Sequence, residues 1–162
     1  MNLIKTIKGL LSSPSPEQYH NSSARSRVMW LEKVQGERVN TFDIDGVIFI
    51  NKDLGGIYPG PNDAIITGRS FEEAPETYKM LQERGIFNYV FFNDLKFKDK
   101  TRRSSGQHKA RTLNYLLLKG VNVGVHFEDD PVQVMEIRRG CPRARVVHVY
   151  HNLTTLENVR HT

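Results

Sequence analysis

VNTFDIDGVIFI, at residues 39–50, is the stretch of the sequence that decides the fold. Its β-branched and aromatic residues predict a buried strand. The strand ends in Asp43 and Asp45, two positions apart, and Gly46 then allows the chain to turn away at once. Two carboxylates at a strand end of an α/β sheet can converge on a cation and a bound phosphate. The alternative is that both aspartates are turn or helix-cap residues, which are common at such positions.

Length and composition narrow the class of protein. The chain has 162 residues, which is enough for one domain with a substantial core. Its net charge of +5 fits an anionic partner, with phosphate, nucleic acid and an acidic lipid surface as candidates. Cys141 is the only cysteine, which excludes an intrachain disulfide and a thiolate metal cluster and predicts a cytoplasmic setting. No apolar run approaches the length of a transmembrane helix.

The first 36 residues are interpreted as a helical extension and linker that precedes the main domain, residues 37–162. Between Leu3 and Leu11 apolar residues recur at helical spacing, with Lys5 and Lys8 on other faces. Such an amphipathic stretch docks on its own domain, on a partner or on a membrane surface, and the first of these is the most ordinary outcome. Residues 28–34 indicate one or two further helical turns.

From residue 47 onward, turns, strands and helices follow one another in a regular order. Residues 49–57 predict a small hairpin because a strong turn signal lies at residues 51–56. Further strands are predicted at residues 64–66, 89–92, 121–127 and 146–150, and helices at about 70–85, 107–119 and 131–140. This alternation predicts an α/β fold with a mostly parallel five-stranded sheet covered on both faces.

A basic segment precedes the second of these helices. Lys96, Lys98, Lys100, Arg102 and Arg103 are predicted to form a loop that closes at residues 104–106. A charge run is usually a solvated face. Since this one lies between a strand end and a helix, on the side of the sheet where a site is expected, substrate contact is the competing interpretation.

Chemically useful side chains follow several predicted strands. Thr67-Gly68-Arg69 follows the second strand, Lys109 lies in a helix, and Glu128-Asp129-Asp130 follows the fourth strand. The carboxyl ends of parallel strands share one edge of the sheet, so these groups and the two aspartates are expected on one rim. The alternatives are that Thr67-Gly68 is ordinary strand-to-helix punctuation and that Lys109 is a surface lysine, with His108 and Arg111 as competitors for its role.

The order of these residues resembles the haloacid dehalogenase (HAD) superfamily of aspartate-nucleophile phosphohydrolases. The match runs from Phe42 to about Val149 and covers most of the chain. It depends on four features, which are Phe42-Asp43-Ile44-Asp45-Gly46, Ile65-Ile66-Thr67-Gly68-Arg69, Lys109 and the acidic cluster at residues 128–130. The resemblance implies a Rossmann-like three-layer sandwich.

The resemblance also implies a role for each catalytic group. Asp43 would attack phosphorus and form an aspartyl-phosphate. Asp45 would protonate the leaving oxygen and later deprotonate the hydrolytic water. The Thr67 hydroxyl and neighbouring backbone N–H groups would hold a phosphoryl oxygen, and Lys109 would offset the charge around the nucleophile.

Mg²⁺ is the cofactor that the resemblance implies. Its ligands would be the Asp43 carboxylate, the Asp45 backbone carbonyl and an acid from the last cluster. The family's acidic pair aligns either as Glu128-Asp129 or as Asp129-Asp130. Asp129 is therefore the expected direct ligand and Glu128 the second candidate, because Asp130 before Pro131 is well explained as a helix cap.

The spacing of the motifs predicts an open site without a large cap domain. Only a hairpin fits between Asp45 and Thr67, and only one helix, one strand and a loop fit between Thr67 and Lys109. An open basic site suits a large substrate, such as a nucleic-acid end or a phosphoprotein. Among capless relatives, the sequence is most similar to the phosphatase domains of polynucleotide repair enzymes, which remove a terminal 3′-phosphate. The residues expected to bind such a substrate are Gly68, Arg69, Lys96, Lys98, Arg102 and Arg103.

Two other functions are compatible with the sequence. One is a phosphatase of nucleotides or other small phosphate esters, with selectivity from the basic loop or from a partner subunit. The other is a non-catalytic adaptor that keeps the fold and binds nucleic acid or a membrane through its basic surface. The combination of nucleophile, acid, hydroxyl, lysine and metal acids favours an enzyme, a phosphoric monoester hydrolase.

Overall fold

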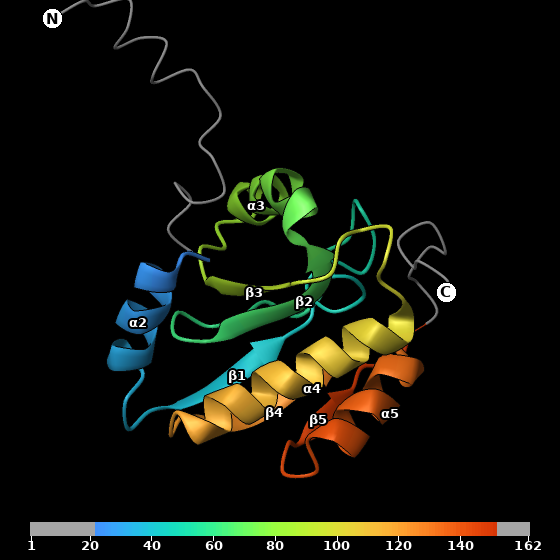
Figure 1. The fold of residues 1–162 in the computed structure, drawn as a ribbon. Coiled ribbons are helices and arrows are strands. Elements are labelled where there is room, and N and C mark those ends of the chain that lie inside the picture. Colours follow the sequence, from blue (N-terminus) through green and yellow to red (C-terminus); the bar gives the residue numbers. More distant parts are fainter. Residues whose placement is uncertain (1–21, 152–162) are drawn as a thin grey trace, which may run out of the picture.

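The computed structural model describes residues 22–151 of the chain, which form one sheet with helices on both faces (Figure 1). The strands are β1 (Arg38–Phe42), β2 (Ala64–Ser70), β3 (Tyr89–Asn93), β4 (Asn122–Glu128) and β5 (Val146–His148). The α-helices are α2 (Ala24–Lys33), α3 (Ala74–Glu83), α4 (Arg102–Leu118) and α5 (Pro131–Gly140), and a 3₁₀ helix, η1 (Phe71–Glu73), precedes α3. The predicted amphipathic stretch at residues 3–11 lies outside the described residues.

The five strands are all parallel and lie in the order β3-β2-β1-β4-β5. The prediction of a mostly parallel five-stranded sheet is thereby confirmed. The chain adds β2 and β3 on one side of β1, then crosses over and adds β4 and β5 on the other side. The order of strands reverses between β1 and β4, and open α/β sheets bind ligands beyond the carboxyl ends of the strands at such a point.

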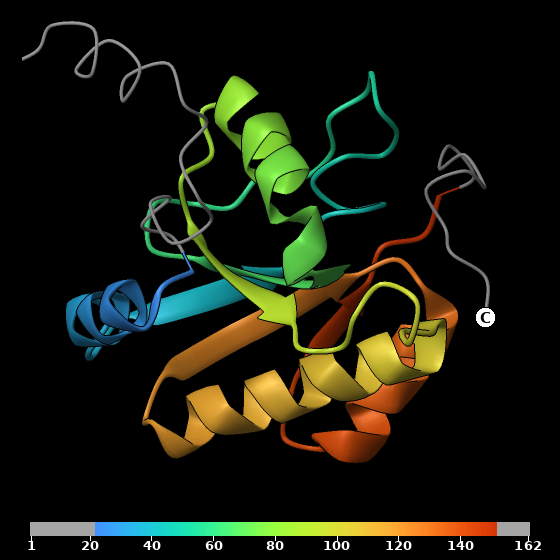
Figure 2. The same cartoon turned by 45° about the horizontal axis from the view of Figure 1, so that its top comes forward.

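Two hydrophobic cores lie on the opposite faces of the sheet. The first packs α2, α4 and α5 against one face, and the second packs α3 and residues 44–49 against the other. Figure 2 shows the sheet between α3 on one side and α4 with α5 on the other. The arrangement is that of a Rossmann-like sandwich with three layers.

Helix α2 packs as part of this body. The Trp30 side chain is buried in the same core as α4, and its ring stacks on Tyr89 at a centroid distance of 6.1 Å. Its indole N–H donates a hydrogen bond to the backbone carbonyl of Asn62 at 2.9 Å. Val34, which follows the helix, is buried in the same core.

The segment between β1 and β2 contains a tight turn instead of a helix. An antiparallel bridge joins Phe49 to Gly55, and the Ile50 N–H donates to the Leu54 carbonyl at 2.9 Å. The Asn51 side-chain oxygen accepts hydrogen bonds from two backbone N–H groups inside the turn. Residues 43–63 hold no larger insertion, as the spacing of the motifs predicted.

Helix α4 begins earlier than predicted. The prediction of a basic loop that continues to residue 106 is wrong, because the helix starts at Arg102. Thr101 and Ser104 form a capping box, in which each side-chain oxygen accepts a hydrogen bond from the other residue's backbone N–H, at 3.0 and 2.7 Å. Arg102 and Arg103 therefore lie in the first turn of a helix.

Candidate functional site

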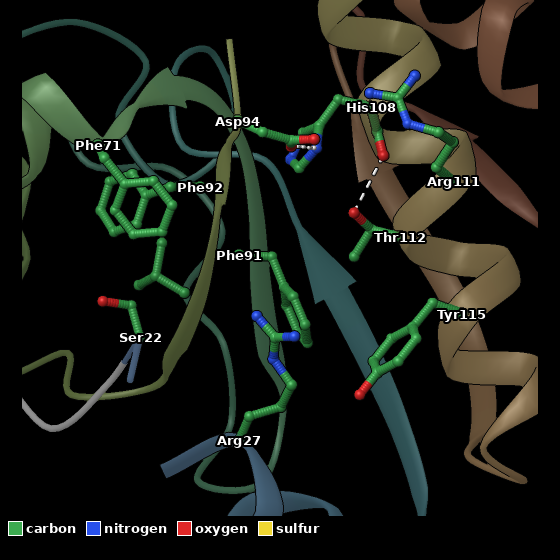
Figure 3. A pocket seen from close by; sticks show the side chains of 11 residues that line it. Ser22, Arg27, Phe71, Phe91, Phe92, Asp94, His108, Arg111, Thr112 and Tyr115 are labelled. Atoms are coloured by element: carbon green, nitrogen blue, oxygen red, sulfur yellow. Dashed lines mark hydrogen bonds and ion pairs between the residues drawn. The ribbon is translucent and has the colours of Figure 1, made fainter. Parts of the chain in front are cut away.

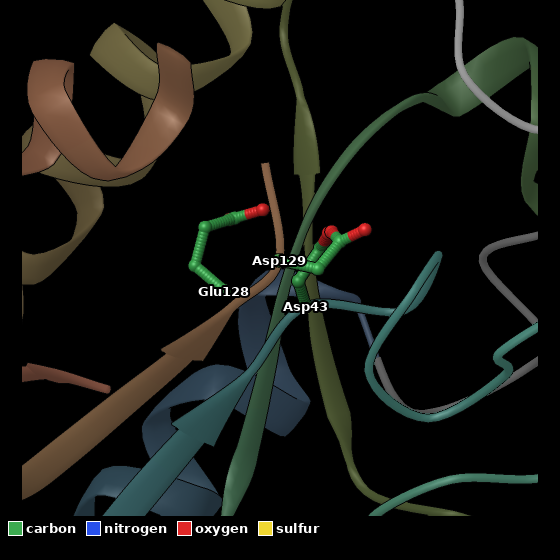
Figure 4. Close-up of side chains that lie close together, drawn as sticks. All are labelled: Asp43, Glu128 and Asp129. Atoms are coloured by element: carbon green, nitrogen blue, oxygen red, sulfur yellow. The ribbon is translucent and has the colours of Figure 1, made fainter. Parts of the chain in front are cut away.

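Three carboxylates meet where β1 and β4 end side by side (Figure 4). Asp43 directly follows β1, while Glu128 ends β4 and Asp129 comes next. One oxygen of each carboxylate lies within 4.8 Å of an oxygen of the other two. The pairing of β1 with β4 causes this meeting, because the Asp43 N–H donates to the Phe127 carbonyl at 3.0 Å and keeps the two strands in register.

Lys109 supplies the positive charge of this cluster. It is fully buried on α4, and its Nζ lies 2.9 Å from Asp43 Oδ1 and 2.5 Å from Glu128 Oε2. Burial alone would lower the pKa of Lys109, but these two carboxylates raise it above its ordinary value, so the ammonium is charged. Its predicted competitors lie elsewhere, since His108 pairs with Asp94 and Arg111 is exposed.

One ammonium does not balance the two buried carboxylates of Asp43 and Glu128 and the half-buried one of Asp129. Burial raises the pKa of Asp43 to about 7, and the charge of Glu128 contributes to the rise. Burial also raises the pKa of Asp129 to about 8, with a further contribution from Asp43. Raised values in a cluster of acids indicate that the fully ionised form lacks positive charge. The all-oxygen donor set fits a hard divalent cation such as Mg²⁺.

Gly46 is the residue against which Asp129 packs. Its φ is +81°, and a Cβ at this position would lie 1.9 Å from Asp129 Oδ2. The last residue of β5 and the chain after it contact the same two residues. His148 Nε2 lies 2.9 Å from the Asp129 carbonyl oxygen, and His151 Nε2 lies 2.6 Å from the Gly46 carbonyl oxygen. The two histidines thus hold the backbone of the two residues, and Gly46 leaves the space that the Asp129 carboxylate occupies.

Asp45 forms a separate ion pair with Arg69. Arg69 Nε and Nη2 donate to the two carboxylate oxygens at 2.9 and 2.7 Å. Burial would raise the pKa of Asp45, but the contact with Arg69 outweighs it and the pKa lies below its ordinary value. Arg69 also donates to the Thr77 hydroxyl at 3.2 Å. Two predicted site residues are therefore paired with each other in this structure.

The Thr67-Gly68 segment is held by contacts from its own strand, from β3 and from the loop before α4. Thr67 is buried, and its hydroxyl oxygen accepts a hydrogen bond from the Arg69 N–H at 3.1 Å. The Gly68 carbonyl accepts from Lys100 Nζ at 3.2 Å and from Asn93 Nδ2 at 3.4 Å. Lys100 also forms an ion pair with Glu73.

Sequence reasoning missed Lys100 and Asn93 as residues of the site. Lys100 belongs to the basic segment that the sequence did single out, whereas an asparagine at a strand end carries no comparable signal.

Of the remaining residues predicted to bind substrate, two arginines form ion pairs and two lysines are exposed. Arg102 donates to both oxygens of Asp130 at 2.9 and 2.6 Å, and Arg103 lies 3.4 Å from Glu136. Asp130 accepts from the Val132 N–H at 2.9 Å, which confirms its predicted role as the cap of α5. Lys96 and Lys98 are exposed, and neither forms an ion pair with another residue between 22 and 151.

His126 of β4 is a further buried group beside the cluster. Its Nδ1 lies 2.8 Å from the Thr41 hydroxyl oxygen, and its Nε2 lies 3.6 Å from Glu128 Oε2. Burial, together with the charge of Lys109, lowers the pKa of His126 to about 3. The imidazole is therefore neutral and adds no positive charge to the cluster.

The chain was compared with protein-family models and with curated proteins, and neither comparison found a match. None of the helices in residues 22–151 is both long and apolar enough to cross a bilayer. The chemistry of the residues at this edge of the sheet is therefore what points to a function.

Proposed function

We propose that this chain is a Mg²⁺-dependent phosphoric monoester hydrolase of the HAD type. The observation that carries the proposal is the meeting of Asp43, Asp129 and the buried Lys109 at the point where the strand order reverses. These groups come from three separate segments of the chain, and their order matches the nucleophile, metal acid and lysine of that superfamily. Thr67 lies at the neighbouring strand, β2, where the phosphate-binding hydroxyl is expected.

In the proposed reaction an Asp43 carboxylate oxygen attacks phosphorus and the bond from phosphorus to the leaving oxygen breaks. The products of this step are an aspartyl-phosphate and an alcohol, which takes its proton from Asp45. A water molecule then attacks the aspartyl-phosphate, gives its proton to Asp45 and releases phosphate. Lys109 contacts Asp43 Oδ1 throughout and holds the carboxylate in place.

Asp43 and Asp129 are the residues that fit best as metal ligands, together with the predicted Asp45 carbonyl. Both oxygens of Glu128 are already engaged, one by Lys109 and the other by the Asp130 N–H. Glu128 is therefore better suited to orient Lys109 than to bind the ion directly. When bound, Mg²⁺ offsets the negative charge of the nucleophile and the phosphate.

The pairing of Asp45 with Arg69 sets a condition on proton transfer. As an ionised partner of Arg69, Asp45 can accept a proton but has none to donate. A guanidinium also binds phosphate in a bidentate manner, so an incoming phosphate ester offers Arg69 a second partner. In the proposed reaction Arg69 moves from Asp45 to the substrate, which allows Asp45 to take up the proton that it later donates.

A polynucleotide end, such as a 3′-phosphate, is the proposed substrate. Residues 46–63, between the nucleophile and β2, supply only a turn, so nothing as large as a cap domain lies there. The exposed Lys96 and Lys98 follow β3 at the same edge of the sheet, and the chain carries a net charge of +5. Exposed lysines bind a phosphate backbone without reading its sequence.

Phosphate release from p-nitrophenyl phosphate tests the reaction. Wild-type protein should release phosphate only with Mg²⁺, and Asp43→Asn should abolish release because an amide is not a nucleophile toward phosphorus. Asp53→Asn, the same change at an exposed turn residue, is the matched control and should retain activity. Release that survives Asp43→Asn would overturn the nucleophile assignment. Wild-type protein that is inactive with several divalent metals and substrates would favour the adaptor function instead.

A further inference from the structure

A cavity of about 360 Å³ lies between β3, an edge strand of the sheet, and α4 (Figure 3). Aromatic side chains form much of its wall, with Phe91 and Phe92 from β3, Phe71 from η1 and Tyr115 from α4. Figure 3 shows Phe71 and Phe92 at one end of the cavity and Tyr115 at the other. The Phe71 ring is 49% exposed and touches Phe92 at a centroid distance of 5.2 Å, so part of its surface is open for stacking.

Two arginines give this aromatic cavity a positive charge. Arg27 of α2 lies over the rings of Phe91 and Tyr115, at 5.4 and 5.7 Å from their centroids. Arg111 of α4 lines the cavity, is exposed, and has no ion-pair partner within residues 22–151. The wall also carries the exposed Asp94, 3.3 Å from His108 Nδ1, and burial lowers the pKa of His108 to about 4, so this imidazole is neutral and two arginines face one carboxylate. A ligand of this cavity is therefore expected to be anionic.

The cavity begins beside the candidate active site, because β3 and α4 contribute residues to both and η1 directly follows β2. Phe71 comes four residues after Thr67, and His108 directly precedes Lys109 on α4. Asp94 directly follows Asn93, whose side chain contacts the Gly68 carbonyl. From this end the cavity runs back along β3 to Tyr115, away from the carboxyl edge of the sheet.

We propose that this cavity binds the nucleotides next to the phosphate of a single-stranded nucleic-acid end. The bases stack on Phe71 and its neighbouring rings, and Arg111 with Arg27 holds the backbone. Aromatic rings beside cations are the combination that single-stranded nucleic acids bind, because every base has a face that can stack. An apolar peptide is disfavoured as the ligand, since it would remove the exposed guanidinium of Arg111 from water without pairing it. The inference deepens the proposed function and depends on it for the position of the phosphate.

Fluorescence anisotropy with a labelled single-stranded oligonucleotide that ends in a 3′-phosphate tests the proposal. The measurement uses full-length Asp43→Asn protein, so that the phosphate is not removed. Adding Phe71→Leu should weaken binding roughly ten-fold, the order of one lost stack between a base and an aromatic ring. Phe87→Leu is the matched control, because Phe87 is 65% exposed and lies outside the cavity.

The arginine contribution is separated from stacking by its salt dependence. Arg111→Gln should lower the slope of log affinity against log salt by about 0.7, the value for one phosphate contact on a single strand. Phe71→Leu should leave that slope unchanged, because stacking releases no counterion. Arg138→Gln, at an exposed arginine of α5 outside the cavity, is the control for a general loss of charge.

Binding that is equal in both cavity variants and their controls would overturn the inference, provided that thermal unfolding shows each variant to be folded. Release of phosphate from p-nitrophenyl phosphate by protein with the native Asp43 reports on the proposed function independently. If the protein releases phosphate but the cavity variants bind the oligonucleotide as their controls do, the proposed phosphatase function stands and the proposed role of the cavity is wrong. If the cavity variants selectively lose binding but the protein releases no phosphate, the cavity binds nucleic acid and the proposed phosphatase function is wrong.

Discussion

Gly46 shows how a single backbone position sets the geometry of the acidic cluster. Alanine at Gly46 would be strained at φ +81° and would also collide with the Asp129 carboxylate. Gly120 separates these two effects, since its φ is +79° and a Cβ there would meet nothing within 4 Å. Gly120→Ala should therefore cost only the backbone strain, about 1–2 kcal/mol.

Gly46→Ala should cost a further 1–3 kcal/mol, approximately the penalty for overpacking a filled site. Binding of Mg²⁺ should raise the melting temperature of the wild-type protein. Gly46→Ala should abolish this rise, because it displaces Asp129. Urea unfolding and thermal unfolding of the two variants, with and without Mg²⁺, check both expectations. A Gly46→Ala protein that matches Gly120→Ala and still responds to Mg²⁺ would show that Asp129 does not depend on this contact.

The raised pKa values of Asp43 and Asp129, about 7 and 8, predict how stability depends on pH. An unfolded aspartate has a pKa near 3.9, so below pH 8 the folded state holds protons that the unfolded state has lost. Without metal, the free energy of unfolding should therefore fall as pH rises through 7 and 8. His108 changes stability in the opposite direction at lower pH, because burial lowers its pKa to about 4.

Urea unfolding in EDTA between about pH 7 and 8.5 avoids most of the histidine contribution. The expected fall is on the order of 2 kcal/mol, from the linkage of the two carboxylates. Saturating Mg²⁺ should remove the fall, because a bound cation keeps both groups ionised in the folded state. Asp43→Asn should flatten the dependence and Asp53→Asn should not. The same slope in both variants would contradict the assignment.

At this scale the sequence predicted which residues meet but not all of their partners. Asp43, Lys109 and Asp129 were predictable because each occupies a strand end or helix position that the fold brings to one edge. The pairing of Asp45 with Arg69 was not predicted, because each side chain was assigned a separate role toward the substrate. Whether two neighbouring charges pair depends on rotamers and on burial, which sequence spacing does not specify.

At the scale of elements, the periodicity of apolar residues predicted the positions of the strands and helices. It did not predict the start of α4. The basic residues and Ser104-Ser105-Gly106 suggested a loop, because serine and glycine favour turns. One local and one tertiary contact override this preference. The Thr101 capping box satisfies the first backbone N–H groups, and the pair of Arg102 with Asp130 offsets an arginine at the positive end of the helix.

Helix α2 provides a test of where the folded domain begins. Trp30 is 8% exposed and contacts the sheet through Tyr89 and Asn62, although the domain was predicted to start at residue 37. Trp30→Ala should lower the free energy of unfolding by about 3–5 kcal/mol, as expected for removal of a buried indole. Met29→Ala, at a neighbouring residue that is 60% exposed, should change it by less than about 0.5 kcal/mol.

Urea unfolding gives the free energy of unfolding of both variants. It is followed by far-UV circular dichroism, because Trp30→Ala removes the tryptophan on which fluorescence would depend. A loss below 1 kcal/mol for Trp30→Ala would identify α2 as a loosely docked extension, and the boundary at residue 37 would then stand.

At the scale of the whole molecule, the charge is uneven around the candidate site. The acidic cluster lies between β1 and β4, and the exposed Lys96 and Lys98 follow β3 two strands away. A small ester that reaches Asp43 has no need of these lysines, whereas a polynucleotide that extends from the site can reach them. The two classes of substrate should therefore differ in their dependence on salt.

The value of kcat/KM for a 3′-phosphorylated oligonucleotide should fall about ten-fold between roughly 50 and 200 mM salt, as expected for a few phosphate contacts. Turnover of p-nitrophenyl phosphate and of a mononucleotide should change much less. The double variant Lys96→Gln/Lys98→Gln should reduce the salt dependence for the oligonucleotide, because two of those contacts are lost. Lys33→Gln/Lys79→Gln removes the same charge at exposed positions of α2 and α3 outside the cavity and should not reduce the salt dependence. Equal salt dependence for all three substrates would favour a phosphatase of small esters. It would mean that no part of the oligonucleotide beyond its reacting phosphate contacts the protein.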